Sequence, residues 1–160
     1  MSLPAFLSSS DIQSFKDAID AEGIFQKDER KEIKDEIDRL MSSRNDLVIT
    51  LSNLSSSQAP SEQEKLHAQT VLVGSIASCS SFLSTQYLIA ARQRGAKGRT
   101  SSNSLATRIT NIGLTFVNQI QAFIAQLKSI IGIHEWKVTF KVITGFPTNT
   151  LEAGIEVTFH

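Results

Sequence analysis

Cysteine and histidine are the side chains in this sequence that could act as a nucleophile or bind a metal. The chain has one cysteine, Cys79, and three histidines. A cysteine nucleophile needs a nearby base and an electropositive setting. His67, however, precedes Cys79 by twelve residues, about 18 Å along a helix. No spacing among these residues fits a metal site. We therefore expect a small packed side chain at Cys79, and we expect no catalytic residue, no metal or other cofactor, and no enzyme.

Basic side chains in one short turn could instead bind phosphate groups. The turn combines four basic residues with two glycines: Arg92, Arg94, Lys97, Arg99, Gly95 and Gly98. A G-x-x-G turn between helices is the phosphate-clamping element of KH modules. The strands that precede the turn in those modules are missing, and no aromatic side chains accompany it to stack on bases. Nucleic-acid binding is therefore the third hypothesis, and the expected contact of the four basic residues is an anionic membrane surface.

Acidic residues are distributed very unevenly along the chain. Residues 1–64 hold 13 acidic and 7 basic residues, whereas residues 65–134 hold 7 basic residues and no Asp or Glu. Residues 135–160 hold 3 acidic and 2 basic residues, so the net charge of the whole chain is zero. Such segregation is typical of chains that meet a nucleic acid, a membrane surface or an acidic partner.

Acidic amphipathic helices are predicted over residues 10–55. The first begins with capping-box spacing between Ser10 and Gln13. The second begins near Asp28, and its apolar residues follow a heptad pattern with one exception, Arg44. A long surface helix of a bundle is the simpler interpretation of this pattern, and an intermolecular coiled coil is the alternative.

An acid-free helical hairpin is predicted over residues 61–132, with the basic turn between its two helices. Ser61 and Glu64 have capping-box spacing at its start, and Gly132 ends it. Uncharged stretches of both helices are long enough to span a bilayer. Their many Ser, Thr, Asn and Gln residues argue against constitutive membrane-spanning helices, yet neutral groups enter a membrane at lower cost than a carboxylate. The apolar side chains expected to insert are Val71, Leu72, Ile76, Phe82, Leu83, Ile112, Phe116, Ile120 and Phe123.

A simpler explanation of the uncharged hairpin remains open. The inner face of any helical bundle excludes charge, and its outer face normally carries Glu and Lys. Acidic helices that cover the outer face would explain why it lacks them here.

The C-terminal segment, residues 134–160, alternates apolar and polar residues with period two and predicts an antiparallel β-hairpin. One register pairs Lys141 with Glu152 and Lys137 with Glu156. An isolated hairpin is marginal in water, so its apolar face should cover the bundle or contact another chain. That face consists of Trp136, Val138, Phe140, Ile155, Val157 and Phe159.

The layout resembles that of the helical pore-forming toxins of bacteria, and the size of the chain resembles the small component of bacterial two-component insecticidal toxins. The resemblance lies in the segments Leu66–Ala91, Arg92–Arg108, Ile109–Leu127 and Trp136–Phe159. No diagnostic motif accompanies it, so no functional residue carries over. The resemblance implies a bundle with an insertion hairpin and a small β appendage.

The sequence as a whole predicts a single mainly α domain, residues 1–160: a four-helix bundle with long helices and a C-terminal β-hairpin. The leading hypothesis is membrane binding or pore formation, with a homo-oligomer on the lipid membrane or a larger protein partner. The runner-up is a non-catalytic interaction or scaffold module. The N-terminus lacks the basic and apolar regions of a Sec signal, so we expect a protein made without one and released to act on target-cell membranes.

Overall fold

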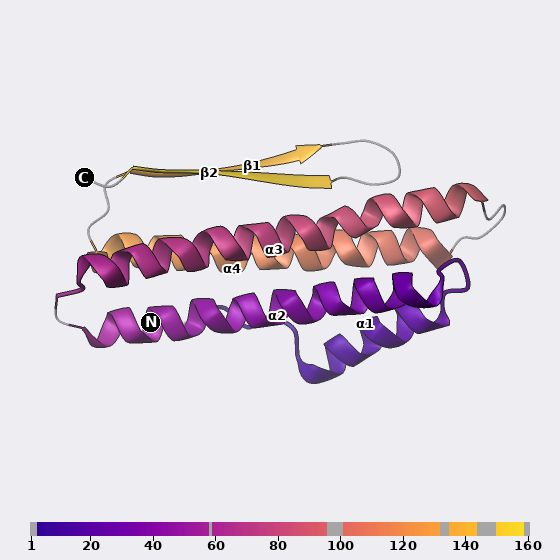
Figure 1. Cartoon of the computed structure of the whole chain (residues 1–160), viewed down its shortest axis with the longest axis horizontal. Coiled ribbons are helices and arrows are strands. Elements are labelled where there is room, and N and C mark those ends of the chain that lie inside the picture. Colours follow the sequence, from indigo (N-terminus) through magenta and orange to yellow (C-terminus); the bar gives the residue numbers. More distant parts are fainter. Residues whose placement is uncertain (1–2, 58, 96–100, 132–134, 144–149, 159–160) are drawn as a thin grey trace.

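Four helices pack against one another along most of the chain. The computed structural model describes residues 3–57, 59–95, 101–131, 135–143 and 150–158, with side chains over 3–57, 59–92 and 105–130. The helices are α1 (Ser9–Ala21), α2 (Lys27–Ser56), α3 (Glu62–Gly95) and α4 (Ser101–Ile131). The three long helices lie side by side, and α1 packs at one end of them (Figure 1). The prediction of a mainly helical bundle is confirmed.

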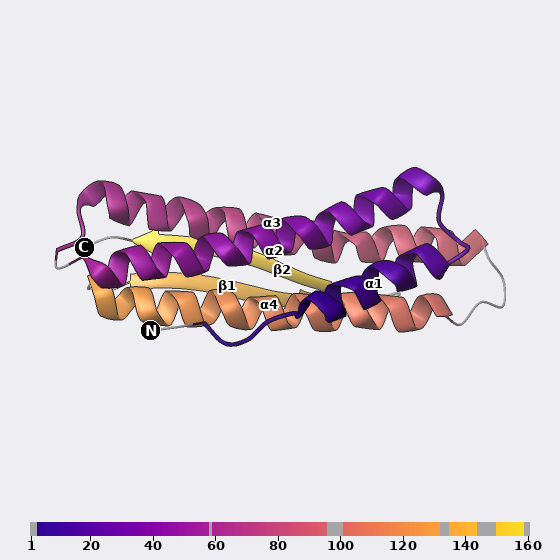
Figure 2. The same cartoon turned by 90° about the horizontal axis from the view of Figure 1, so that it is seen from below.

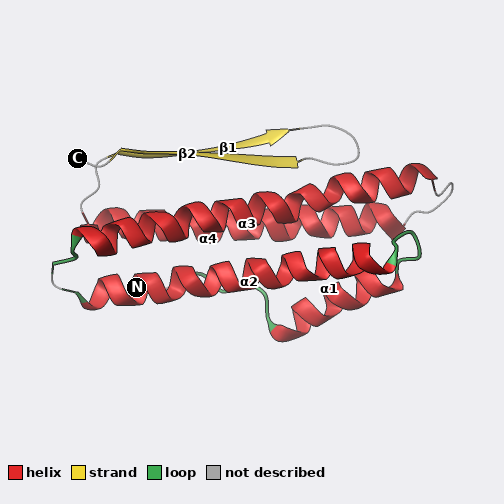
Figure 3. Ribbon diagram, viewed as in Figure 1, coloured by secondary structure: helices red, strands yellow, loops and turns green. Residues whose placement is uncertain are grey.

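Two strands follow the helices, β1 (Glu135–Ile143) and β2 (Thr150–Thr158). They pair antiparallel, with Lys137 opposite Glu156 and Lys141 opposite Glu152. Figures 1 and 3 show the strands beside α3 and α4, on the side away from α2. The side chains of the predicted apolar face lie outside the described residues: Trp136, Val138, Phe140, Ile155, Val157 and Phe159. Docking through that face therefore stays a prediction.

The N-cap of α1 is Ser8, two residues before the predicted cap, Ser10. The Ser8 Oγ accepts a hydrogen bond from the Asp11 backbone N–H at 3.1 Å, and the Asp11 Oδ2 accepts one from the Ser8 N–H at 3.0 Å. The predicted capping box at Ser10 and Gln13 is wrong, because Ser8 and Asp11 have the same spacing and form the box instead. A carboxylate in the first turn also interacts favourably with the positive end of the helix dipole.

Helices α2 and α3 begin within one residue of where the sequence indicates. Helix α2 begins at Lys27, and the Glu29 Oε1 accepts from the N–H of its N-cap residue, Gln26, at 2.8 Å. The capping box predicted for α3 is confirmed, because Ser61 and Glu64 exchange hydrogen bonds of 3.2 Å in both directions.

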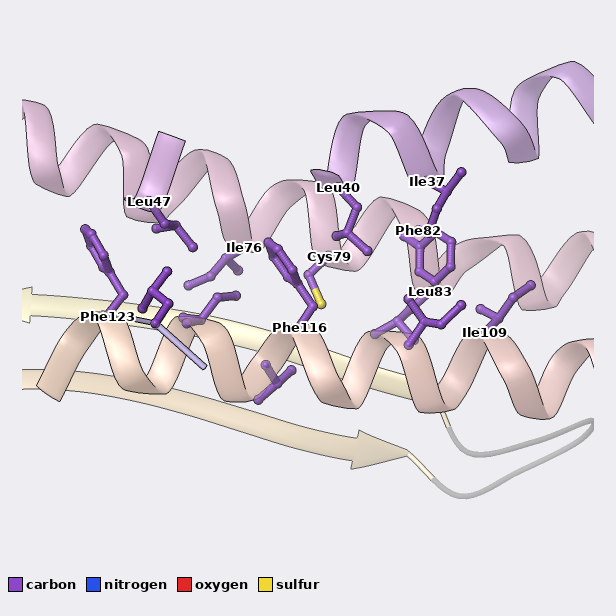
Figure 4. Close-up of a cluster of buried hydrophobic side chains, with 14 of the residues drawn as sticks. Ile37, Leu40, Leu47, Ile76, Cys79, Phe82, Leu83, Ile109, Phe116 and Phe123 are labelled. Carbon is purple, nitrogen blue, oxygen red and sulfur yellow. The ribbon is translucent and has the colours of Figure 1, made fainter. Parts of the chain in front are cut away.

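The core is a continuous cluster of apolar side chains from all four helices (Figure 4). The heptad row predicted for α2 is buried in it: Ile33, Ile37, Leu40, Leu47, Leu51 and Leu54. Of the nine apolar side chains assigned to membrane insertion, Val71 is half-buried and the other eight are buried: Leu72, Ile76, Phe82, Leu83, Ile112, Phe116, Ile120 and Phe123. In this conformation these side chains build the interior of the bundle.

Helices α3 and α4 approach each other closely at Gly113. A Cβ atom at this position would lie 2.8 Å from the Cγ of Leu83 and closer still to one of its methyl carbons. Leu83 is itself buried, and a close-packed neighbourhood leaves such a side chain little room to move. The missing side chain at Gly113 therefore sets the spacing of the two helices.

We expect Gly113→Ala to lower the free energy of unfolding by about 1–3 kcal/mol, the usual cost of overpacking a core. Gly74 is the matched control on α3, because a Cβ there would have no neighbouring atom within 4 Å. Gly74→Ala should raise stability by up to about 1 kcal/mol, since alanine favours a helix over glycine. Urea unfolding followed by circular dichroism measures both, and a Gly113→Ala protein as stable as wild type would contradict the close contact.

Candidate functional site

Cys79 lies in the contact between α3 and α4, as Figure 4 shows. Its side chain is buried, as predicted, and its Sγ lies 3.7 Å from the backbone oxygen of Gly113. Burial raises the pKa of the Cys79 thiol to about 12. The thiol is therefore protonated at neutral pH and a poor nucleophile. Among the residues with described side chains, no group of three His, Cys, Asp or Glu residues could hold a metal ion.

His67 borders a pocket of about 390 Å³ at the turn between α2 and α3. Six of its seven lining residues are of polar type: Thr50, Asn53, Leu54, Ser61, Gln63, Glu64 and His67. The one carboxylate among these side chains, that of Glu64, already caps α3 through the Ser61 N–H. The pocket contains neither Cys79 nor a basic residue of the predicted turn, so it does not join the predicted candidates into one site.

Arg92 belongs to the predicted basic turn, and the structure places it in an ion pair with Glu29 of α2. The Arg92 Nε donates to both carboxylate oxygens of Glu29, at 3.0 and 2.9 Å, and its Nη2 also bonds to Oε2. The guanidinium of Arg92 holds the pKa of Glu29 below its ordinary value, and the Gln26 N–H adds to this effect. Arg92 is thus engaged inside the molecule. The side chain of Arg94 and the whole of Lys97 and Arg99 lie outside the described residues.

A second polar contact joins α2 to α3 near the middle of the bundle. The Oγ atoms of Ser43 and Ser78 lie 2.7 Å apart. The Ser78 hydroxyl also bonds to the backbone oxygen of Gly74 at 3.0 Å. Because a hydroxyl has a single proton, Ser43 is then the donor in the contact between the two helices.

Arg108 of α4 contacts α1. Its guanidinium carbon lies 5.8 Å from the centre of the Phe15 ring, a cation–π contact. Its Nη2 lies 3.4 Å from the Ser14 Oγ. These contacts, with Arg92–Glu29 and Ser43–Ser78, cross the surface between the acidic helices α1–α2 and the acid-free helices α3–α4. We call this surface the seam.

Hydroxyl groups on α3 and α4 bond within their own helices. Six of them donate to a backbone oxygen three or four residues earlier, at 2.6–3.1 Å: Thr70, Ser78, Ser84, Thr85, Thr110 and Thr115. The fully buried Gln86 side chain reaches across from α3 to the Ala106 backbone oxygen of α4, at 3.2 Å. The six hydroxyl donors are therefore satisfied within their own helices. The buried Ser75 Oγ and Gln86 Oε1, in contrast, have no hydrogen-bond partner among the described residues.

Helix α3 carries apolar side chains outside the core as well as inside it. Leu66, Val73 and Tyr87 are 58%, 50% and 55% exposed. Helix α3 is therefore not clearly amphipathic, whereas α4 has distinct apolar and polar faces. Within the described part of the chain, Glu62–Arg92 is the one helical segment long and apolar enough to cross a membrane, with a mean hydropathy of 1.2 in its best window. In the structure, 44% of that window is buried inside the bundle. Core helices of bundles also meet this criterion of length and hydropathy.

Comparison with known proteins leaves the function open. The chain matches no protein-family model, no curated protein and no solved structure. The resemblance to helical pore-forming toxins therefore rests on the layout of the segments alone.

Replacing Glu29 by Gln should destabilise the bundle in a pH-dependent way. Because the pKa of Glu29 is lowered in the folded protein, ionised Glu29 contributes stability above its unfolded pKa, and the contribution is lost as the pH falls through the folded pKa. Glu29→Gln should therefore lower the urea midpoint at pH 7, and this difference should disappear in strong acid. Glutamine can keep the capping role of residue 29, so the variant isolates the ion pair with Arg92.

The control is Glu32→Gln, on an exposed residue of the same helix, which should leave the midpoint nearly unchanged at both pH values. A deficit of Glu29→Gln that stayed constant from pH 7 into strong acid would show that the ion pair is not its cause.

Proposed function

We propose that this protein binds lipid membranes and inserts the α3–α4 hairpin, as a membrane-binding or pore-forming protein. The observation that carries the proposal is the bonding of six of the hairpin's hydroxyl groups within their own helices. A hydroxyl that donates to its own helix can leave water without an unsatisfied donor, which is how Ser and Thr are accommodated in membrane helices. Six hydroxyls of α3 and α4 have this geometry.

The charge and length of the hairpin support the same proposal. Residues 65–134 contain no carboxylate, and a carboxylate inside a bilayer costs a few kcal/mol. Helix α3 has 34 residues and α4 has 31, so each is at least about 45 Å long and exceeds the 30 Å of a bilayer core. Their buried apolar side chains would then face lipid or other copies of the hairpin.

Insertion requires that the seam open while α3 and α4 stay together. The two helices are joined by the close contact at Gly113 and by Gln86, whose side chain reaches the α4 backbone. The seam is crossed by the ion pair of Arg92 and by the hydroxyl contact of Ser43 with Ser78. Acidic α1 and α2 act in this proposal as a cover that keeps the hairpin out of the membrane.

A disulfide across the seam should block the proposed activity. The Ser43 and Ser78 oxygens are 2.7 Å apart, so cysteines at both positions are placed to form a disulfide. We expect the oxidised S43C/S78C/C79A protein to keep its helical content and to release no dye from vesicles of mixed anionic and neutral lipids. Reduction should restore release, because the seam can then open.

C79A alone is the matched control, since it removes the native thiol beside position 78 and should be equally active with and without reductant. Release by the oxidised triple variant at the reduced rate would contradict opening at the seam. If wild type neither binds vesicles nor releases dye, the proposed function itself is wrong.

The basic turn is proposed to contact anionic headgroups. Arg92 is excluded from the test because its guanidinium is bonded to Glu29, so the informative variant is R94Q/K97Q/R99Q. Each lost charge should weaken binding to anionic vesicles by about 1 kcal/mol at low salt, with little effect at high salt or on neutral vesicles. Unchanged binding to anionic vesicles would remove the turn from the mechanism.

Assembly belongs to the same proposal. Pores require several copies or a larger partner, and the apolar face predicted for the C-terminal hairpin is the surface proposed for such contacts. From the size and layout of the chain, we propose that it is the small component of a two-component toxin.

A protein-interaction module is the second candidate. Leu66, Val73 and Tyr87 lie at multiples of seven residues on the exposed side of α3, a spacing that suits a docked partner helix. This function does not need the seam to open, so the oxidised S43C/S78C/C79A protein would still bind the partner. The disulfide therefore separates the two candidates.

A further inference from the structure

The chain before α1 lies along the bundle in an extended conformation. Residues 3–7 contain no helix or strand, and Figure 2 shows this segment running beside α4 before α1 begins. We call residues 3–7 the strap. Leu3 is buried in the core cluster, and the ring of Phe6 is half-buried with its centre 5.6 Å from that of Phe116. The strap thus adds Leu3 to the core and, three residues later, covers Phe116 of α4 with Phe6.

Two polar side chains hold the backbone of the strap. The Pro4 oxygen accepts from the Arg44 Nη2 at 3.0 Å and from the Gln119 Nε2 at 2.9 Å. Gln119 also lies 3.4 Å from the Ala5 oxygen, and its own Oε1 accepts from the Arg44 Nε at 3.3 Å. The network thus consists of the side chains of Arg44 and Gln119 and the backbone oxygens of the strap.

The same two side chains interrupt the apolar rows of their helices. Arg44 is the exception in the heptad row of α2, and Gln119 stands between Phe116 and Phe123 in the inward row of α4. Gln119 is 1% exposed. A buried amide would be costly without partners, and the strap's backbone oxygens supply them. Arg44 and Gln119 therefore share one role that explains their place in apolar rows: both bind the backbone of the strap.

We propose that Arg44, Gln119 and Phe116 form a docking site for an extended peptide segment with apolar residues at positions i and i+3, and that the strap is its releasable occupant. The site would recognise two backbone oxygens and two apolar side chains. An extended segment can present these groups without forming a helix or a strand. Release of the strap uncovers Phe116 and Gln119 on α4. The consequence for membranes rests on the proposed function, whereas the docking site itself does not.

Chymotrypsin provides the test, because it cleaves after Phe6 and Leu7 only when the strap is free. In the full chain, Gln119→Leu keeps the side-chain volume and removes the donor to Pro4. We expect removal of the N-terminal residues, followed by mass spectrometry, to become at least about tenfold faster, since cleavage tracks the population of the open segment. Gln121→Leu is the matched control, on an exposed residue two positions along α4, and should be cleaved like wild type.

Phe6→Ala is a second variant that alters the strap and leaves the helices untouched. It should also accelerate cleavage after Leu7, with urea midpoint and helical content near those of wild type. Wild-type cleavage rates in both Gln119→Leu and Phe6→Ala would overturn the docking site. Faster cleavage of α2, α3 and α4 together with the strap would overturn it as well, because general unfolding would then be the cause.

The link to membranes has its own readout. Dye release from mixed anionic and neutral vesicles should be faster for Phe6→Ala than for wild type. Faster strap cleavage with unchanged dye release would overturn the control of membrane access by the strap. If no variant and not even wild type released dye, the proposed function would be refuted, while the cleavage rates would still decide on the docking site.

Discussion

The contact between α3 and α4 is the interaction on which the rest of the structure depends. Gly113 lets Leu83 and Cys79 pack directly against the backbone of α4, and Gln86 bonds to the same helix two turns away. Helix α2 packs on this pair from one side and β2 contacts it from the other. Because glycine has no Cβ atom, Gly113 allows α3 and α4 to approach closely enough to pack directly against each other.

Charge is segregated along the chain, and the ion pair of Arg92 with Glu29 crosses the seam. Residues 65–134 contain no acid, yet Arg92 has its counterion in Glu29 and Arg108 has an aromatic partner in Phe15. The acidic helices thus supply the basic side chains of the hairpin with neighbours. The apolar row of α2 packs across the same seam, so opening it would break these polar contacts and expose buried apolar surface.

Polar residues in apolar rows divide into two kinds. Thr85 and Thr110 bond to their own helices, so they place no demand on a neighbour and are compatible with either water or lipid outside the bundle. Arg44 and Gln119 instead depend on the strap, because the Pro4 oxygen is their shared acceptor. The first kind keeps the hairpin independent of its surroundings, and the second ties the closed bundle to its N-terminal segment.

The sequence by itself determined the features that depend on neighbours within a few residues. The capping box of Ser61 and the inward row of α2 follow from spacings of three and four residues, and the packed state of Cys79 follows from its small, uncharged neighbours. The predicted first cap is wrong because Ser8–Asp11 and Ser10–Gln13 have the same spacing, and it is Ser8 and Asp11 that form the hydrogen bonds.

Only the tertiary structure decided which residues of different helices meet. Glu29 pairs with Arg92 over a separation of 63 residues, and Pro4 meets Gln119 over 115. Periodicity shows that Arg44 lies on the inner side of α2, but it carries no information on what stands opposite. The physical reason is that a helix repeats the same face at every turn, so the register between two helices is set by close contacts such as Gly113 with Leu83, which no single-helix pattern contains.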